Sequence, residues 1–192
     1  MATVKTPDTA QRILDVAEEL VQVRGFNAFS YADVASELGM TKAGLHYHYP
    51  GKAELGEALI ARYAGRFSTA LDEIEARDAS PADKLDAYVK LYADVLSAHR
   101  MCLCGMLAAE YQTLPEGLQT AIVGFFDENE AWLTRLLKEG RADGSLHFDG
   151  TPRDTAGMII SGLEGAMLVA RPYGDLKHFS KSAQTLVAAL TS

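Results

Sequence analysis

The sequence has few cysteines and no long apolar run. Cys102 and Cys104 are the whole complement in 192 residues, too few for a disulfide framework and too close together for a comfortable bridge. No apolar stretch approaches the roughly 20 residues of a membrane-spanning helix. The opening MATVKTPDTAQ also lacks the apolar core of a signal peptide. We therefore expect a soluble protein of the reducing cytoplasm, without a membrane partner.

Basic residues are in the minority. The chain has 18 Lys and Arg against 26 Asp and Glu, a net charge of −8 at pH 7. Such a balance disfavours general affinity for polyanions, so any contact with nucleic acid has to use a small local surface.

A short segment in the first third of the chain lacks acids. Between Met40 and Ala53 the sequence is MTKAGLHYHYPGKA, which holds two His, two Tyr, two Lys and two Gly and no carboxylate. A carboxylate beside a phosphate would be repelled, whereas Lys, Tyr and His side chains donate to phosphate oxygens. The segment is therefore our candidate for a nucleic-acid surface.

Nearly every segment has the apolar spacing of a helix, and alternating strand patterns are scarce. We expect an all-α fold of about nine helices, in which the first three are short and a long fourth links them to a bundle. Ser30 with Asp33 resembles a capping box, Thr41 caps the third helix and Pro50-Gly51 ends it. The clearest loop is GRADGSLHFDGTPRD, residues 140–154, and the last helix is expected over Phe179–Leu190.

Three helices joined by glycine turns predict a DNA-reading helix-turn-helix. Ala35 is small enough for close helix approach, Gly39 supplies the turn, and Leu45 points inward to anchor the third helix. The outward residues are then Thr41, Lys42, Gly44, His46, Tyr47 and His48. The unpaired N–H groups near Thr41 add an anion site at the helix start.

This region also resembles the N-terminal domain of the TetR/AcrR family of bacterial transcriptional regulators. The matching pieces are RILDVAEELVQVRGF and FSYADVASELGMTKAGLHYHYPGKAEL. The sequence departs from the usual family pattern at Tyr49, Gly51 and Ala53. The resemblance implies a helix-turn-helix domain over residues 1–50 and a ligand-binding and dimerisation domain over residues 51–192. It also implies a homodimeric repressor that leaves double-stranded operator DNA when a small-molecule inducer binds.

By the same resemblance, nine residues occupy DNA-contacting positions: Ser30, Tyr31, Thr41, Lys42, Gly44, His46, Tyr47, His48 and Lys52. Tyr47, His48 and Lys52 resemble phosphate contacts, while Lys42, Gly44 and His46 are better placed to read bases. The spacing His46-x-His48 also raises a metal site, but residues two apart on a helix point in different directions. We therefore predict no metal and no cofactor.

The later helices carry two further candidate surfaces. A mainly apolar pocket with a few polar groups is how helical bundles bind small molecules. Candidate lining residues are Tyr92, Cys104, Tyr111, Asn129, Trp132 and Ser161. Repeated small residues in MIISGLEGAMLVAR predict close helix approach, because glycine otherwise weakens a helix. The resemblance implies a dimer interface on the last two helices, which favours a two-fold interface at Gly162, Gly165 and Ala166 over packing within one chain.

Two alternatives stay open. Cys102 and Cys104 are either two small core residues or, with Arg100 nearby, a redox or electrophile sensor; a soft-metal site lacks partner ligands. An all-helical enzyme is the competing class. His99, His147 and His178 have no partner at a catalytic spacing, and Ser161 lies in SGLEG and not in a nucleophile elbow.

Overall fold

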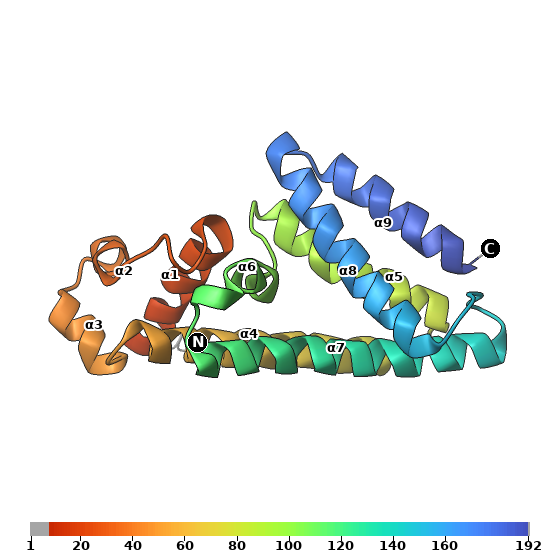
Figure 1. Cartoon of the computed structure of the whole chain (residues 1–192), viewed down its shortest axis with the longest axis horizontal. Coiled ribbons are helices and arrows are strands. Elements are labelled where there is room, and N and C mark those ends of the chain that lie inside the picture. Colours follow the sequence, from red (N-terminus) through yellow and green to blue (C-terminus); the bar gives the residue numbers. More distant parts are fainter. Residues whose placement is uncertain (1–7, 192) are drawn as a thin grey trace, which may run out of the picture. The chain divides into compact units, whose positions relative to one another are not determined.

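The computed structural model describes residues 8–191, in which the chain forms nine α-helices and two 3₁₀ helices (Figure 1). The predicted all-α class is confirmed. The elements are α1 (Thr9–Arg24), α2 (Tyr31–Leu38), α3 (Lys42–His48), α4 (Lys52–Glu75), α5 (Pro81–Ser97), α6 (Leu103–Ala109), η1 (Tyr111–Thr113), α7 (Glu116–Asp143), α8 (Pro152–Ala170), η2 (Arg171–Tyr173) and α9 (Leu176–Thr191).

Part of the stretch expected to lack a signal core, residues 1–7, lies outside the described residues. Among the helices of residues 8–191, none is long and apolar enough to cross a membrane.

The predicted helix starts follow from polar caps. Ser30 and Asp33 form a capping box, in which the Ser30 N–H donates to Asp33 Oδ2 at 2.7 Å. At Thr41 the side-chain oxygen accepts the Gly44 N–H at 3.1 Å. Between these two caps, Gly39 ends α2 in the left-handed conformation with φ of 62°, which glycine adopts without steric cost.

Three helix bounds differ from the expected ones. The first helix is not short, since α1 has 16 residues. Helix α7 continues to Asp143, into the expected loop, and Gly144 with φ of 80° then ends it. Helix α9 begins at Leu176 instead of Phe179, because the Asp175 carboxylate accepts the Lys177 N–H at 2.8 Å and caps an earlier turn.

The chain divides into two compact units. The first combines the residues up to Tyr63 with Leu103–Ile122. Within it α1 contacts both α2 and α6, and α2 contacts α3. Its core includes Ile13, Val21, Val34, Leu45, Leu55 and Leu118.

The second unit combines Ala64–Cys102 with Val123 and the residues that follow. Helices α5, α8 and α9 contact one another there, and α8 and α9 run side by side (Figure 1). Its core includes Leu85, Tyr88, Leu133, Ile159, Leu163 and Phe179. Helices α4 and α7 each contribute to both units, so the functional boundary predicted near residue 50 does not coincide with the division into compact units.

Candidate DNA interface and regulatory core

Helix α3 is anchored by one residue and presents the others. Leu45 is fully buried, which stabilises the helix by about 2 kcal/mol relative to an exposed side chain. Lys42, His46 and Tyr47 are exposed, and the Tyr47 side chain is 85% accessible. A large aromatic left this open on a packed domain indicates a binding surface.

The neighbouring side chains give α3 a defined surface. The rings of Tyr47 and His48 meet edge to face with centroids 5.3 Å apart. His46 Nδ1 lies 2.9 Å from the Pro50 carbonyl oxygen, so its proton is fixed on Nδ1 and Nε2 is left for an outside partner. At Gly44, a Cβ atom would lie 3.2 Å from Met40 Cε, so the absence of a side chain keeps the start of α3 uncrowded.

Tyr31 joins α2 to the turn after α3. Its hydroxyl lies 2.9 Å from the Tyr49 carbonyl and 2.5 Å from the Gly51 carbonyl, and its ring packs 4.7 Å from His46. Burial, followed by the nearby Glu54 charge, raises the pKa of Tyr31 to about 12. Tyr31 therefore positions His46 and stays a neutral hydrogen-bond donor at physiological pH.

Two other residues with predicted DNA contacts are held by the protein itself. Lys52 Nζ donates to the Phe29 carbonyl at 2.6 Å and lies over the rings of Phe26 and Phe29, 4.7 and 4.4 Å from their centroids. Burial lowers the pKa of Lys52. The Ser30 hydroxyl donates to Asp33 Oδ2 at 2.6 Å. Both side chains stabilise the loop before α2, and their contact with DNA stays a prediction.

The loop between α1 and α2 is fixed by the segment that follows α6. The Glu110 carboxylate accepts the Phe26 N–H at 2.7 Å and the Asn27 N–H at 3.3 Å. Asn27 Nδ2 in turn donates to Thr113 Oγ1 at 2.7 Å. This contact could not be predicted from local sequence, because Phe26 and Glu110 lie 84 residues apart.

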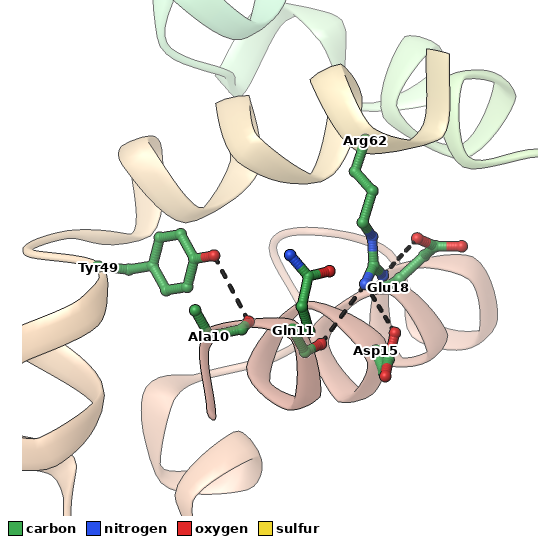
Figure 2. Close-up of polar contacts among 6 residues, drawn as sticks. All are labelled: Ala10, Gln11, Asp15, Glu18, Tyr49 and Arg62. Carbon is green, nitrogen blue, oxygen red and sulfur yellow. Dashed lines mark hydrogen bonds and ion pairs between the residues drawn. The ribbon is translucent and has the colours of Figure 1, made fainter. Parts of the chain in front are cut away.

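Arg62 of α4 forms ion pairs with two acids of α1 (Figure 2). Its Nη1 lies 2.6 Å from Asp15 Oδ1, and its Nη2 lies 2.7 Å from Glu18 Oε2. The same Nη1 donates to the Gln11 carbonyl at 3.4 Å. Glu18 and Arg62 are largely shielded from water, where paired charges interact more strongly than on the surface. The signal in the sequence was Glu18 itself, an acid on the apolar face of α1.

A cavity of about 290 Å³ lies between the second part of α4 and α7. Phe67, Leu71, Phe125, Asn129 and Trp132 line it, beside Ser68, Asp72, Glu128 and Arg135. Of the six residues predicted to bind a ligand, Asn129 and Trp132 line this cavity. Tyr92 does not line the cavity, but its ring packs against Phe67 with centroids 6.1 Å apart. Cys104 and Tyr111 belong to the other compact unit, and Ser161 is exposed on α8.

Buried hydrogen bonds extend from the cavity wall to α5 within the second unit. The Tyr88 hydroxyl donates to Asn129 Oδ1 at 3.2 Å and lies 3.1 Å from the Tyr92 hydroxyl. Tyr88 also stacks on Trp132 with centroids 5.6 Å apart. Trp132 Nε1 is buried without a hydrogen-bond partner within residues 8–191. A buried donor of this kind costs stability unless a ligand or water completes it.

A buried acid and thiol adjoin these tyrosines. The Cys102 thiol hydrogen-bonds to the Glu164 carboxylate. Burial raises the pKa of Glu164 to about 7, and the Cys102 bond opposes that rise. Glu164 Oε1 has no hydrogen-bond partner among the described residues. Glu164 was detectable in the sequence as the one acid inside the apolar run MIISGLEGAMLVAR.

The residues predicted for a dimer interface lie on α8, and one of them also adjoins α9, because a Cβ atom at Gly162 would lie 3.0 Å from Leu186 Cδ1. Gly162 and Gly165 are exposed and Ala166 is half-buried. A Cβ atom at Gly165 would meet no atom within 4 Å. Met158, Leu168 and Val169, with exposed fractions of 50%, 61% and 60%, continue the same surface.

Within residues 8–191, no group of three or more His, Cys, Asp or Glu is arranged to hold a metal ion.

The fold and the exposed α3 define a helix-turn-helix protein with a helical regulatory domain, and comparisons with known proteins agree. The family model described as bacterial regulatory proteins, tetR family, matches residues 13–59. A second model, the tetracyclin repressor-like C-terminal domain, matches residues 81–186. The chain therefore belongs to the TetR family of bacterial transcriptional regulators, which are DNA-binding proteins and not enzymes.

Individual relatives are similar along most of the chain. A TetR-family regulator from Agrobacterium tumefaciens superposes with a TM-score of 0.92 at 32% identity, covering 95% of this chain and 97% of that one. The transcriptional regulator AcuR of Cereibacter sphaeroides is 25% identical over 84% of this chain and 75% of its own length. The repressor NemR of Escherichia coli K12 is 24% identical over 94% of both chains.

The buried Glu164 predicts a pH-dependent stability. Its folded-state pKa of about 7 exceeds the ordinary value of 4.5, so its contribution is greatest below pH 4.5 and is lost as the pH rises through 7. Glu164→Gln should remove that loss. Between pH 5 and pH 8, wild type should lose about 2 kcal/mol more of its free energy of unfolding than the variant.

Urea unfolding at both pH values measures this difference. Glu73→Gln, which changes an exposed carboxylate on α4, is the matched control and should retain the wild-type pH dependence. Equal pH dependence in wild type and Glu164→Gln would show that Glu164 is ionised in the folded protein at pH 5.

Proposed function

We propose that this protein is a homodimeric repressor that binds a near-palindromic operator through α3 and leaves it when a small molecule binds. The observation that carries the proposal is the acid-free α3, which is anchored by Leu45 and presents Tyr47 to solvent. Two copies of α3 would enter the major groove about one helical turn apart, roughly 34–36 Å. Such a protein would act in the bacterial cytoplasm.

The residues of α3 divide into two groups by position. Thr41, Lys42 and Gly44 lie at the helix start, which in this motif approaches base edges; His46 offers Nε2 to the same surface. Tyr47 and His48 follow and are suited to phosphate oxygens. Lys52 and Tyr31 have their polar atoms engaged by backbone carbonyls, which favours a supporting role for both unless binding rearranges them.

Tyr47→Phe tests the interface with the loss of one oxygen atom. If the hydroxyl donates to a phosphate, operator affinity should fall by about 1 kcal/mol, roughly fivefold, because a single hydrogen bond is lost. Fluorescence anisotropy with DNA from upstream of the protein's own gene, repeated at several salt concentrations, measures the affinity.

Tyr173→Phe is the matched control, since Tyr173 is also exposed, at 61%, but lies in η2 of the other compact unit. It should bind DNA as wild type does. Unchanged affinity for Tyr47→Phe, or equal loss in both variants, would remove Tyr47 from the proposed interface.

The open face of α8 supports pairing with a second copy of this chain. TetR-family proteins usually form dimers, and a two-fold interface needs a self-complementary surface. Gly162 and Gly165 permit close approach of two helices, and Met158, Leu168 and Val169 supply apolar area beside them.

Gly165→Met should prevent that approach. The isolated protomer has room for the side chain at this position, so the fold should survive while the dimer dissociation constant rises at least about tenfold. Sedimentation equilibrium measures the constant. Gly65→Met, on the exposed and uncrowded face of α4, is the control; a wild-type constant in Gly165→Met would place the interface elsewhere.

The cavity between α4 and α7 is the proposed inducer site. Its aromatic walls, with the Asn129 amide and the buried Trp132 N–H, suit a small apolar molecule that carries a hydrogen-bond acceptor. Such a ligand releases DNA only by binding the released conformation more tightly than the DNA-bound one. Helix α4 carries the change, because it lines the cavity and also begins directly after the α3 turn.

A second function, sensing of electrophiles, is favoured by the Cys102–Glu164 hydrogen bond. The carboxylate is positioned to take the thiol proton while the sulfur forms a bond to an electrophilic carbon. Cys102 and Cys104 are both buried, at 2% and 0% exposure, so the reagent would need a local opening. Of the two, Cys102 is the one with a carboxylate identified beside it.

Cys102→Ser tests this function with N-ethylmaleimide as the probe. The thiolate adds to the carbon–carbon double bond of the probe, whose neighbouring carbon takes up a proton. Wild type and Cys104→Ser should lose operator binding after treatment, while Cys102→Ser should retain it. Loss of binding in Cys102→Ser, or retention in wild type, would count against thiol sensing at this residue.

A further inference from the structure

A second cavity of about 290 Å³ lies in the corner formed by the end of α5, the end of α8 with η2, and the start of α9. It is lined by residues of three chain segments: Leu96, Ser97, His99, Arg100, Met101, Ala170, Arg171, Gly174, Asp175 and Leu176. It shares no lining residue with the cavity between α4 and α7. The repressor mechanism proposed above does not use it.

The charged groups of this corner favour an anion. Arg100 and Arg171 come from segments 71 positions apart in the sequence and line the same cavity, with the His99 imidazole beside Arg100. Asp175 is the one carboxylate in the lining, and it accepts the Lys177 N–H. The lining therefore has a net charge of +1 or more in a chain whose net charge is −8. Guanidinium groups match the planar geometry of a carboxylate.

The remaining wall is apolar. Leu96, Met101, Ala170 and Leu176 line the cavity together with the two arginines. An inorganic anion would leave this wall in contact with water, whereas a ligand with a charged end and a short hydrocarbon tail would cover it. The cavity volume lies near the lower end of the range of about 300–1,000 Å³ for small-molecule sites and accommodates a short-chain acid.

We propose that this corner is a binding site for a small organic monocarboxylate, whose carboxylate pairs with Arg100 and Arg171 and whose alkyl chain packs on Leu96 and Met101. The cavity also adjoins the backbone that leads into α6. His99 there has a left-handed φ of 57°, and Met101 is followed by Cys102 and the start of α6 at Leu103.

Equilibrium dialysis with radiolabelled butyrate and the full-length protein tests the site directly and needs no DNA. Its result is therefore independent of whether the repressor function holds. Arg100→Gln and Arg171→Gln should each weaken binding about tenfold or more, because each removes a charge-assisted pair. Arg77→Gln, at an exposed arginine after α4 that lies outside the cavity, should leave butyrate binding unchanged.

Competition among acetate, butyrate and sulfate tests the proposed contact between the ligand's alkyl chain and the apolar wall. Each added methylene should tighten binding about threefold to fourfold while the chain still fits, and sulfate should compete poorly. Far-ultraviolet circular dichroism checks that both arginine variants keep their helix content, and Arg171→Lys should retain part of the affinity if charge is what binds.

Three results would overturn the proposal. One is the absence of saturable butyrate binding to wild type at millimolar concentrations. Another is equal binding by Arg77→Gln and both cavity variants. The third is affinity independent of chain length with full displacement by sulfate, which would mean a nonspecific anion surface in place of a carboxylate site.

Discussion

Electrostatic repulsion is the constraint on which the rest of the structure depends. A chain with a net charge of −8 can approach DNA only where its own carboxylates are absent or engaged. The segment from Met40 to Ala53 meets the first condition by composition. One carboxylate near it, Asp33, meets the second through hydrogen bonds. Asp33 accepts from the backbone and hydroxyl of Ser30, and these bonds lower its pKa. It is thus a negative charge whose lone pairs are already used to start α2.

Carboxylates inside the first compact unit are also engaged by hydrogen bonds or ion pairs. Glu110 is bonded to the backbone N–H groups of Phe26 and Asn27, and Glu18 is paired with Arg62. These acids hold the framework of α1, α2 and α4 against which α3 is set. A carboxylate bonded to backbone donors or a guanidinium is both stabilised and partly neutralised. The negative charge of the domain is thereby used to orient α3, a helix that has no carboxylate of its own.

The sequence predicted the parts of this arrangement that depend on local chemistry. The caps at Ser30 and Thr41, the turn at Gly39 and the inward Leu45 all follow from residues close in sequence. The directions of the long side chains could not be predicted from the local sequence. Lys52 was assigned to phosphate by resemblance, but the rings of Phe26 and Phe29 and the Phe29 carbonyl form a local site for its ammonium. These groups come together only when the loop between α1 and α2 folds.

The regulatory residues were harder to predict for a related reason. Tyr92, Asn129 and Trp132 come together because α5 and α7 pack on each other through Tyr88, and helical spacing within either segment does not reveal that pairing. Cys104 and Tyr111 shared their apolar and aromatic character but belong to the other compact unit. Composition therefore identified the types of residue that line a bundle cavity, and tertiary packing decided which of them do so.

Two features of the chain path allow regulation to reach α3. Helices α4 and α7 each begin in the first compact unit and end in the second, and the chain returns to the first unit between Cys102 and Leu103. A ligand in the α4–α7 cavity, as proposed, would act on the first of these routes, and one beside Arg100 would act on the other. Either can change the population of the DNA-bound conformation only through a difference in its affinity for the two states, and the two effects would then be coupled reciprocally. Glu110 links the chain segment between Cys102 and α6 to the helix-turn-helix. It directly follows α6, and its carboxylate accepts a hydrogen bond from the loop before α2.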